Sequence, residues 1–150
     1  MKPRALSQLE MDMFLERHEK YHSVMLNAIK VRQWAEKYAH THGFENDLTG
    51  MCAIASAKLS RALTDAGIAH EIHLYNDFGC HVFLVVDEHV LDVTATQFHE
   101  FRDIKVVFRN VKEVEPYYYY KSNEKFSSPK ELRAHQIKTQ WPAHQTALPR

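Results

Sequence analysis

The sequence is poor in the features that mark several classes of protein. Cys52 and Cys80 are its only cysteines, too few for a disulfide framework, so free thiols are expected. No unbroken hydrophobic run is longer than 82–86, which is far too short to span a bilayer. Residues 1–20 have no apolar core of signal-peptide length, because Glu10 and Asp12 interrupt them. We therefore expect a cytoplasmic protein that does not enter a membrane.

Charge of one sign is also lacking, since 19 Lys and Arg residues balance 19 Asp and Glu residues. No basic field for nucleic acid is expected. Metal-binding spacings such as C-x-x-C and H-E-x-x-H are absent, and a strand would place His70 and His73 on opposite faces. We expect no metal and no organic cofactor. A metal site that gathers Cys52, Cys80 and His81 with these histidines is the less favoured alternative.

A helical period dominates the N-terminal third. Ser7 and Glu10 have the spacing of a capping box, which predicts a helix that begins near residue 8. Apolar residues then recur at helical spacing as far as Gly43, where the pattern stops. The segment is either one long helix or two helices with a break near 18–22.

A second helix is expected to follow, with Thr49 as its N-cap and Gly67 as its end. Cys52 then lies in the first turn of that helix. Beyond Gly67 the period changes to about two, and Val, Ile, Phe and Tyr predominate. The predicted strands are 69–76, 80–86, 90–95, 104–111 and 113–121.

This order of elements predicts an α+β fold, in which N-terminal helices pack on an antiparallel β-sheet. The length suits a single domain spanning 1–150. We expect its core to cover about 5–121 and to be followed by a polar extension over 122–150. A short helix near 129–138 and a loose tail are expected within that extension. The sequence leaves the oligomeric state open.

Cys52 is a candidate nucleophile because of its expected place at a helix N-terminus. Free N–H groups and the helix dipole stabilise a thiolate there. A base must also be near for the sulfur to act in catalysis. The alternative is that Cys52 is a small buried hydrophobic residue.

The segment CHVFLVVDEHVLDVTATQF, residues 80–98, supplies the candidate base. A turn at Asp87 and Glu88 would place Phe83 opposite Asp92, so that His81 and Asp92 become diagonal neighbours on one face. A carboxylate between apolar strand residues is costly unless it is paired. We therefore expect His81 and Asp92 to interact. A solvent-facing Asp92 on an edge strand is the alternative.

The order Cys52, His81, Asp92 resembles that of the papain-like and transglutaminase-like cysteine enzymes. In particular, HVFLVVDEHVLDVTATQF is similar to the His-aromatic and Asp-x-Thr stretch of the transglutaminase-like branch. The resemblance covers about 46–98. It implies that Cys52 attacks an amide carbonyl to form a thioester, that His81 shuttles protons, and that Asp92 orients His81.

Two residues are candidates for a second oxyanion donor beside the backbone N–H of Cys52. The separation of Asn46 from Cys52 resembles that of the amide donor of papain-like enzymes, although a role as a turn residue is the simpler interpretation. Gln97, just after the hairpin, is the other candidate. The run 117–120, four tyrosines, is interpreted as a strand with one core face, and a platform for a partner is the alternative.

The predicted function is acyl transfer from amide bonds of a protein or peptide substrate, as in a protease, deamidase or transglutaminase. The alternative is an inactive binding or inhibitory module that retains the fold.

Overall fold

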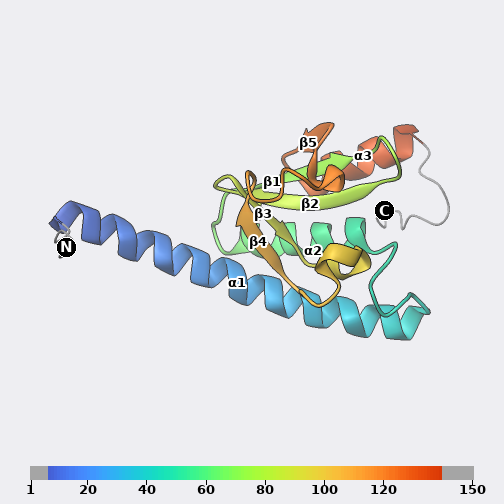
Figure 1. Ribbon diagram of the computed structural model, residues 1–150, viewed down its shortest axis with the longest axis horizontal. Coiled ribbons are helices and arrows are strands. Elements are labelled where there is room, and N and C mark those ends of the chain that lie inside the picture. The colour runs from blue at the N-terminus through green and yellow to red at the C-terminus, as the bar shows by residue number, and fades with distance from the viewer. Residues whose placement is uncertain (1–6, 140–150) are drawn as a thin grey trace.

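A 35-residue helix, α1 (Gln8–His42), begins the fold. Its N-cap is Ser7, whose Oγ accepts a hydrogen bond from the backbone N–H of Glu10, and Gly43 ends it in the left-handed region with φ of 76°. Both predicted ends are therefore confirmed, and the chain forms one helix with no break at 18–22. In the computed structural model, which describes residues 7–139, the first turns of α1 project beyond the remaining elements (Figure 1).

Helix α2 (Cys52–Asp65) begins three residues after the expected N-cap. Thr49 is not the cap, because its backbone N–H and its hydroxyl both donate to Asp47 Oδ1, at 3.0 and 2.7 Å. Local bonding of this kind competes with helix capping. Met51 occupies the N-cap position without a side-chain hydrogen bond. Cys52 nevertheless lies in the first turn, as expected.

Five strands form one sheet in the order β4-β3-β2-β1-β5, and every neighbouring pair is antiparallel. The predicted α+β fold, with helices packed on an antiparallel sheet, is therefore confirmed. The remaining helix and the strands have the following bounds: β1 Glu71–Tyr75, β2 His81–Val86, β3 His89–Asp92, β4 Val107–Asn110, β5 Glu124–Phe126 and α3 Pro129–Thr139.

The strand expected over 113–121 is wrong. This part of the chain forms turns and a single 3₁₀ turn, η3 (Tyr118–Tyr120). Pro116 has no N–H to donate to a ladder, which disfavours a strand here. Two further 3₁₀ turns, η1 (Ala95–Gln97) and η2 (His99–Phe101), follow β3.

The expected end of the core near residue 121 is too early. Strand β5 pairs with β1, and Leu132 of α3 is fully buried in the core. A polar stretch can complete a fold when a few of its residues meet a sheet edge and an apolar face. The predicted helix near 129–138 is confirmed, whereas most of the expected loose tail lies outside the described residues.

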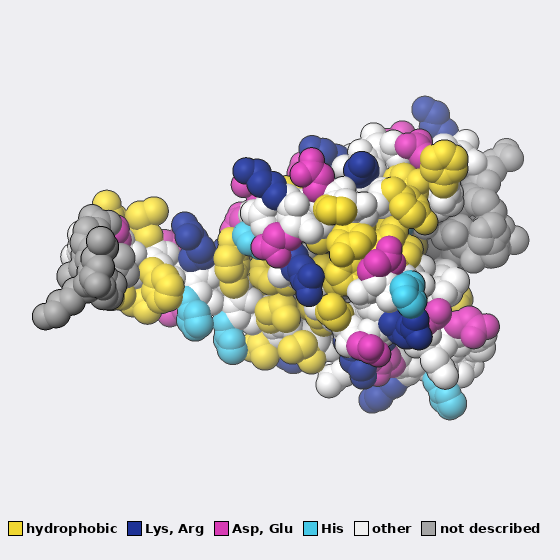
Figure 2. Space-filling model, viewed as in Figure 1, with side chains coloured by type: hydrophobic (Ala, Val, Ile, Leu, Met, Phe, Trp, Pro, Cys, Tyr) yellow, Lys and Arg dark blue, Asp and Glu magenta, His cyan; other side chains and the backbone are white. Residues whose placement is uncertain are grey.

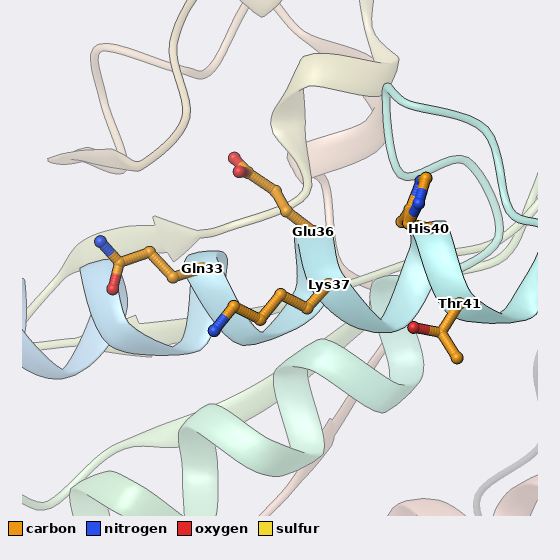
Figure 3. A pocket seen from close by; sticks show the side chains of 5 residues that line it. All are labelled: Gln33, Glu36, Lys37, His40 and Thr41. Atoms are coloured by element: carbon orange, nitrogen blue, oxygen red, sulfur yellow. The ribbon is translucent and has the colours of Figure 1, made fainter.

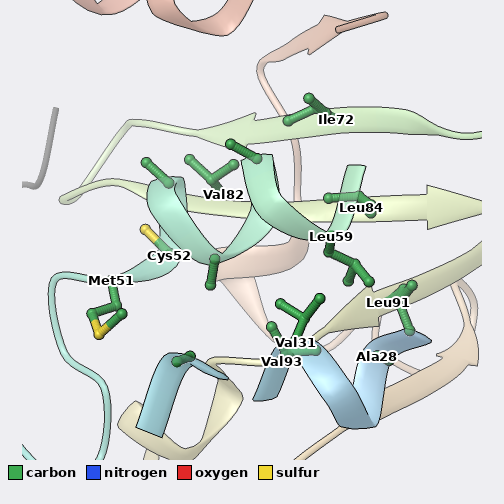
Figure 4. Close-up of a cluster of buried hydrophobic side chains, with 14 of the residues drawn as sticks. Ala28, Val31, Met51, Cys52, Leu59, Ile72, Val82, Leu84, Leu91 and Val93 are labelled. Carbon is green, nitrogen blue, oxygen red and sulfur yellow. The ribbon is translucent and has the colours of Figure 1, made fainter. Parts of the chain in front are cut away.

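Two hydrophobic clusters cover opposite faces of the sheet. The first lies between the helices and the sheet and includes Cys52, Leu59, Val82 and Leu84 (Figure 4). The second is largely aromatic and includes Phe83, Phe101, Tyr119 and Tyr120, among others. The candidate site forms where α2 meets the start of β2, at one end of both clusters.

Within residues 7–139, no helix combines the length and apolar character needed to cross a membrane.

Candidate functional site

The β2–β3 hairpin fixes the relation between His81 and Asp92. Asp87 and Glu88 form its turn with φ of 47° and 64°, as a two-residue primed turn requires. Leu84 pairs with Leu91, which gives the register expected from the sequence. His81 and Asp92 therefore lie on the same face of the sheet.

The two side chains form a buried ion pair. His81 Nε2 lies 2.7 Å from Asp92 Oδ2, and the two residues are 1% and 2% exposed. A charged hydrogen bond of this length is among the stronger polar interactions in proteins. The expected contact is thus present, and Asp92 does not face solvent.

Two further residues donate hydrogen bonds to the Asp92 carboxylate. The backbone N–H and hydroxyl of Thr94 donate to Oδ1 at 2.9 and 3.2 Å, and the Tyr120 hydroxyl donates to Oδ2 at 2.7 Å. Tyr120 was not predicted from the sequence. A buried Asp92 carboxylate requires hydrogen-bond donors, but this requirement does not show which tyrosine of 117–120 supplies one.

The electrostatics of the pair follow from burial and from these contacts. Burial alone would lower the pKa of His81, but the charge and hydrogen bond of Asp92, with smaller contributions from Cys52, raise it to about 9. Burial alone would raise the pKa of Asp92, but His81, Thr94 and Tyr120 hold it below its ordinary value. Burial and the charge of Asp92 raise the pKa of Tyr120, so its hydroxyl remains a donor. The raised pKa of His81 and the lowered pKa of Asp92 both favour the imidazolium and carboxylate forms of the pair.

Cys52 lies at the start of α2 and is 2% exposed. It is close enough to His81 to contribute to the raised pKa of the imidazole. His81 Nε2 is bonded to Asp92, whereas Nδ1 is a buried atom without a hydrogen bond to any residue in the described part of the chain.

Aromatic rings cover the imidazole. The edge of His81 meets the ring of Phe98 at a centroid distance of 4.7 Å, and Phe98 stacks on Tyr119 at 3.7 Å. Phe83 and Tyr120 also contact the His81 ring. The candidate site is therefore closed to solvent, and the aromatic layer of Phe98 and Tyr119 is part of its cover.

Neither oxyanion candidate is bonded to the pair. Asn46 is exposed and lines a surface pocket with Arg32 and Lys105, among other residues. The Gln97 amide nitrogen donates to the backbone carbonyl of Thr94 at 3.0 Å. Among the described residues, no hydrogen bond joins Asn46 or Gln97 to Cys52 or His81. Their suggested role remains a prediction.

One of the surface pockets lies along α1, away from the candidate site. It is lined by residues of α1, among them Gln33, Lys37 and His40 (Figure 3). Neither Cys52 nor His81 lines it. Because Cys52 and His81 are 2% and 1% exposed, a substrate would reach them only if the candidate site opened.

Cys80, His70 and His73 were the other candidates for a metal site, and each has its own contacts. Cys80 packs against the helix-side cluster, to which Cys52 also belongs, and burial together with the nearby Cys52 raises the pKa of its thiol. His70 lies 2.7 Å from the Ser60 hydroxyl, and His73 lies 3.0 Å from the Ser122 hydroxyl. No group of three potential metal ligands occurs among residues 7–139.

The chain was compared with models of protein families, with curated proteins and with solved structures, and none of the three comparisons finds a match.

Proposed function

We propose that the protein is a cysteine-nucleophile enzyme that transfers acyl groups from amide bonds of a protein or peptide substrate. Cys52 is the nucleophile, His81 is the general base and acid, and Asp92 orients His81. The reaction proceeds through a thioester, as in the papain-like and transglutaminase-like enzymes that the sequence resembles.

One observation carries the proposal, namely the different environments of the two nitrogens of His81. Nε2 is fixed by Asp92 at 2.7 Å, whereas buried Nδ1 makes no regular hydrogen bond within residues 7–139. A merely structural buried histidine normally satisfies both nitrogens. Cys52 also helps to raise the pKa of His81. This effect is expected if His81 exchanges a proton with the sulfur.

The geometry supports the following sequence of steps. Cys52 reacts as the thiolate, because its proton has passed to Nδ1 of His81. The sulfur attacks the amide carbonyl carbon, and the backbone N–H of Cys52 at the helix start donates to the oxyanion. The imidazolium of His81 gives its proton to the leaving nitrogen, which completes the thioester. Water or an amine then attacks the thioester, His81 accepts the proton of the attacking group, and the sulfur leaves as thiolate.

Alkylation kinetics test the nucleophile. Iodoacetamide should label Cys52 faster than Cys80 at neutral pH, and His81→Gln should slow the labelling of Cys52 alone. Equal and slow labelling of both thiols in a folded protein would contradict the proposal. Circular dichroism of each variant checks that the fold is retained.

Mass spectrometry of a cell lysate treated with the wild type or with Cys52→Ala tests the reaction. Deamidation adds about 1 Da to a target, cross-linking to an amine removes about 17 Da as ammonia, and proteolysis creates new termini. Any of these products should depend on Cys52. Equal modification by the variant would contradict the assignment of the nucleophile.

Burial favours a second candidate, an inactive binding module. Cys52 and His81 are 2% and 1% exposed, and a site that never opens could not admit substrate. Under this alternative the Cys52→Ala variant would bind the same proteins as the wild type, and the lysate would contain no modified targets.

A further inference from the structure

Helix α1 carries two apolar stripes, and the domain uses only one of them. The first stripe packs against the domain through buried residues that include Val24, Ala28, Val31 and Ala35. The second stripe, called here the outer seam, follows the 4-3-4-3-4 spacing of coiled-coil a and d positions. Its residues are Met11, Leu15, His18, His22, Met25 and Ile29.

Contacts of α1 with the domain turn the outer seam away from the sheet. Lys20 pairs with Asp87 of the β2–β3 turn at 2.7 Å, and the Tyr21 ring meets Phe108 of β4 at 5.3 Å. These residues and the buried stripe fix the rotation of the helix about its axis. The outer seam lies about 100° round from the buried stripe, because each residue advances the helix by that angle.

The outer seam is correspondingly open. Met11, Leu15 and Ile29 are 40%, 49% and 42% exposed, and neighbouring Leu26 is 46% exposed. Hydrophobic and histidine side chains are visible along the projecting part of α1 (Figure 2). Helical turns without tertiary packing are only marginally stable in water, so this part of α1 would be stabilised by a partner.

We propose that two copies of this chain pair through their outer seams as an antiparallel coiled coil. The outer seam is symmetric about its middle: His18 and His22 lie at the centre, with two apolar residues on each side. Antiparallel pairing centred between the histidines places His18 of one copy beside His22 of the other. It also places Met11 opposite Ile29 and Leu15 opposite Met25, so each apolar residue meets an apolar residue.

The charge pattern of α1 favours the antiparallel orientation. Glu10, Asp12 and Glu16 give 8–16 three acidic side chains and no basic one. The stretch 17–30 has three basic side chains and a single acidic one. In the register that pairs 11 with 29, the acidic start of one helix lies beside 24–32 of the other, which has Lys30 and Arg32 and no acidic side chain. Parallel pairing would set the two acidic starts side by side.

The position of the domain on α1 also suits this arrangement. The sheet and α2 lie along the C-terminal part of α1, and the N-terminal turns extend beyond them (Figure 1). Antiparallel pairing therefore separates the two domains to opposite ends of the shared coiled coil. The remainder of each domain, including the candidate site, stays outside the contact.

Sedimentation equilibrium over a concentration series tests the pairing. The wild type should form a dimer, and Leu15→Glu or Ile29→Glu should convert it to a monomer that is still folded. Met13→Glu is the matched control, because Met13 is 51% exposed but lies on the other side of the helix. A wild type that stays monomeric, or a dimer that survives both seam variants, would overturn the proposal.

A spin-label measurement tests the orientation. A label at position 11, introduced as Met11→Cys, should lie about 27 Å from the label of the other copy, because positions 11 and 29 are 18 residues apart at about 1.5 Å each. Parallel pairing would bring the labels to within about 10 Å of each other, the spacing of adjacent helices. A short distance would therefore overturn the antiparallel assignment.

Discussion

At the scale of single residues, Asp92 is the most constrained group in the site. Its buried carboxylate accepts hydrogen bonds from His81, Thr94 and Tyr120. A buried charge is tolerated only when pairing and hydrogen bonds replace its hydration. Removing one of these groups should therefore change the pKa values of the groups that remain or the stability of the fold.

The pKa of His81 should fall when a substitution removes the charge of Asp92. In Asp92→Asn only burial and the smaller effect of Cys52 remain, so we expect the pKa of His81 to fall from about 9 to below its ordinary 6.5. Titration of the ring protons by NMR measures this change. Glu71→Gln is the control, because Glu71 contacts His73 and should leave the titration of His81 in place.

Loss of the Tyr120 hydroxyl should destabilise the fold. Tyr120→Phe removes one of the donors to Asp92 Oδ2, which we expect to cost about 2 kcal/mol, as for other hydrogen bonds to charged groups. The control is Tyr118→Phe, since Tyr118 is 55% exposed and its change should stay within about 0.5 kcal/mol. Urea denaturation measures both variants, and equal effects would contradict this role of Tyr120.

The contact between His81 and Asp92 could be predicted from the sequence, whereas Tyr120 could not. Alternation along a hairpin fixes which residues share a face once the turn is known. Tyr120 reaches Asp92 from a 3₁₀ turn 28 residues further along the chain. No local period links the two, so the choice among neighbouring tyrosines depends on tertiary packing.

At the scale of elements, the β2–β3 turn sets the register on which the site depends. Glu88 adopts φ of 64°, a conformation that costs a residue with a side chain about 1 kcal/mol more than glycine. Glu88→Gly should therefore raise the free energy of unfolding by about 0.5–1 kcal/mol, as measured by denaturation in urea. Glu88→Val should lower it, because a branched side chain fits this conformation poorly.

Local signals predicted some helix ends and failed at others. Ser7 and Gly43 cap α1 as expected, because both act through atoms within a few residues of the helix end. Thr49 does not cap α2, because the hydroxyl and the backbone N–H of Thr49 donate to Asp47 instead. The choice between two local hydrogen bonds of similar energy is not apparent from residue type alone.

At the scale of the whole molecule, the buried pair should make stability depend on pH. The raised pKa of His81 gives a stabilisation that is complete below 6.5 and is lost as the pH rises to about 9. The lowered pKa of Asp92 gives a stabilisation that is present above 3.8 and is lost as the pH falls below it. Stability should therefore be greatest between these limits.

Chemical denaturation at a series of pH values measures this dependence. The free energy of unfolding should decline by up to about 3 kcal/mol between pH 6.5 and pH 9. Asp92→Asn should lack most of that decline. A wild type with the same profile as the variant would show that the pair does not contribute to stability in this range.

The burial of Cys52 has a consequence for the oxidation of its thiol. A thiol that is 2% exposed is shielded from hydrogen peroxide as well as from substrate. Oxidation to sulfenic and sulfinic acids requires access to the sulfur, so Cys52 should be oxidised only as fast as the candidate site opens. While the candidate site stays closed, burial would thus protect Cys52 from irreversible oxidation.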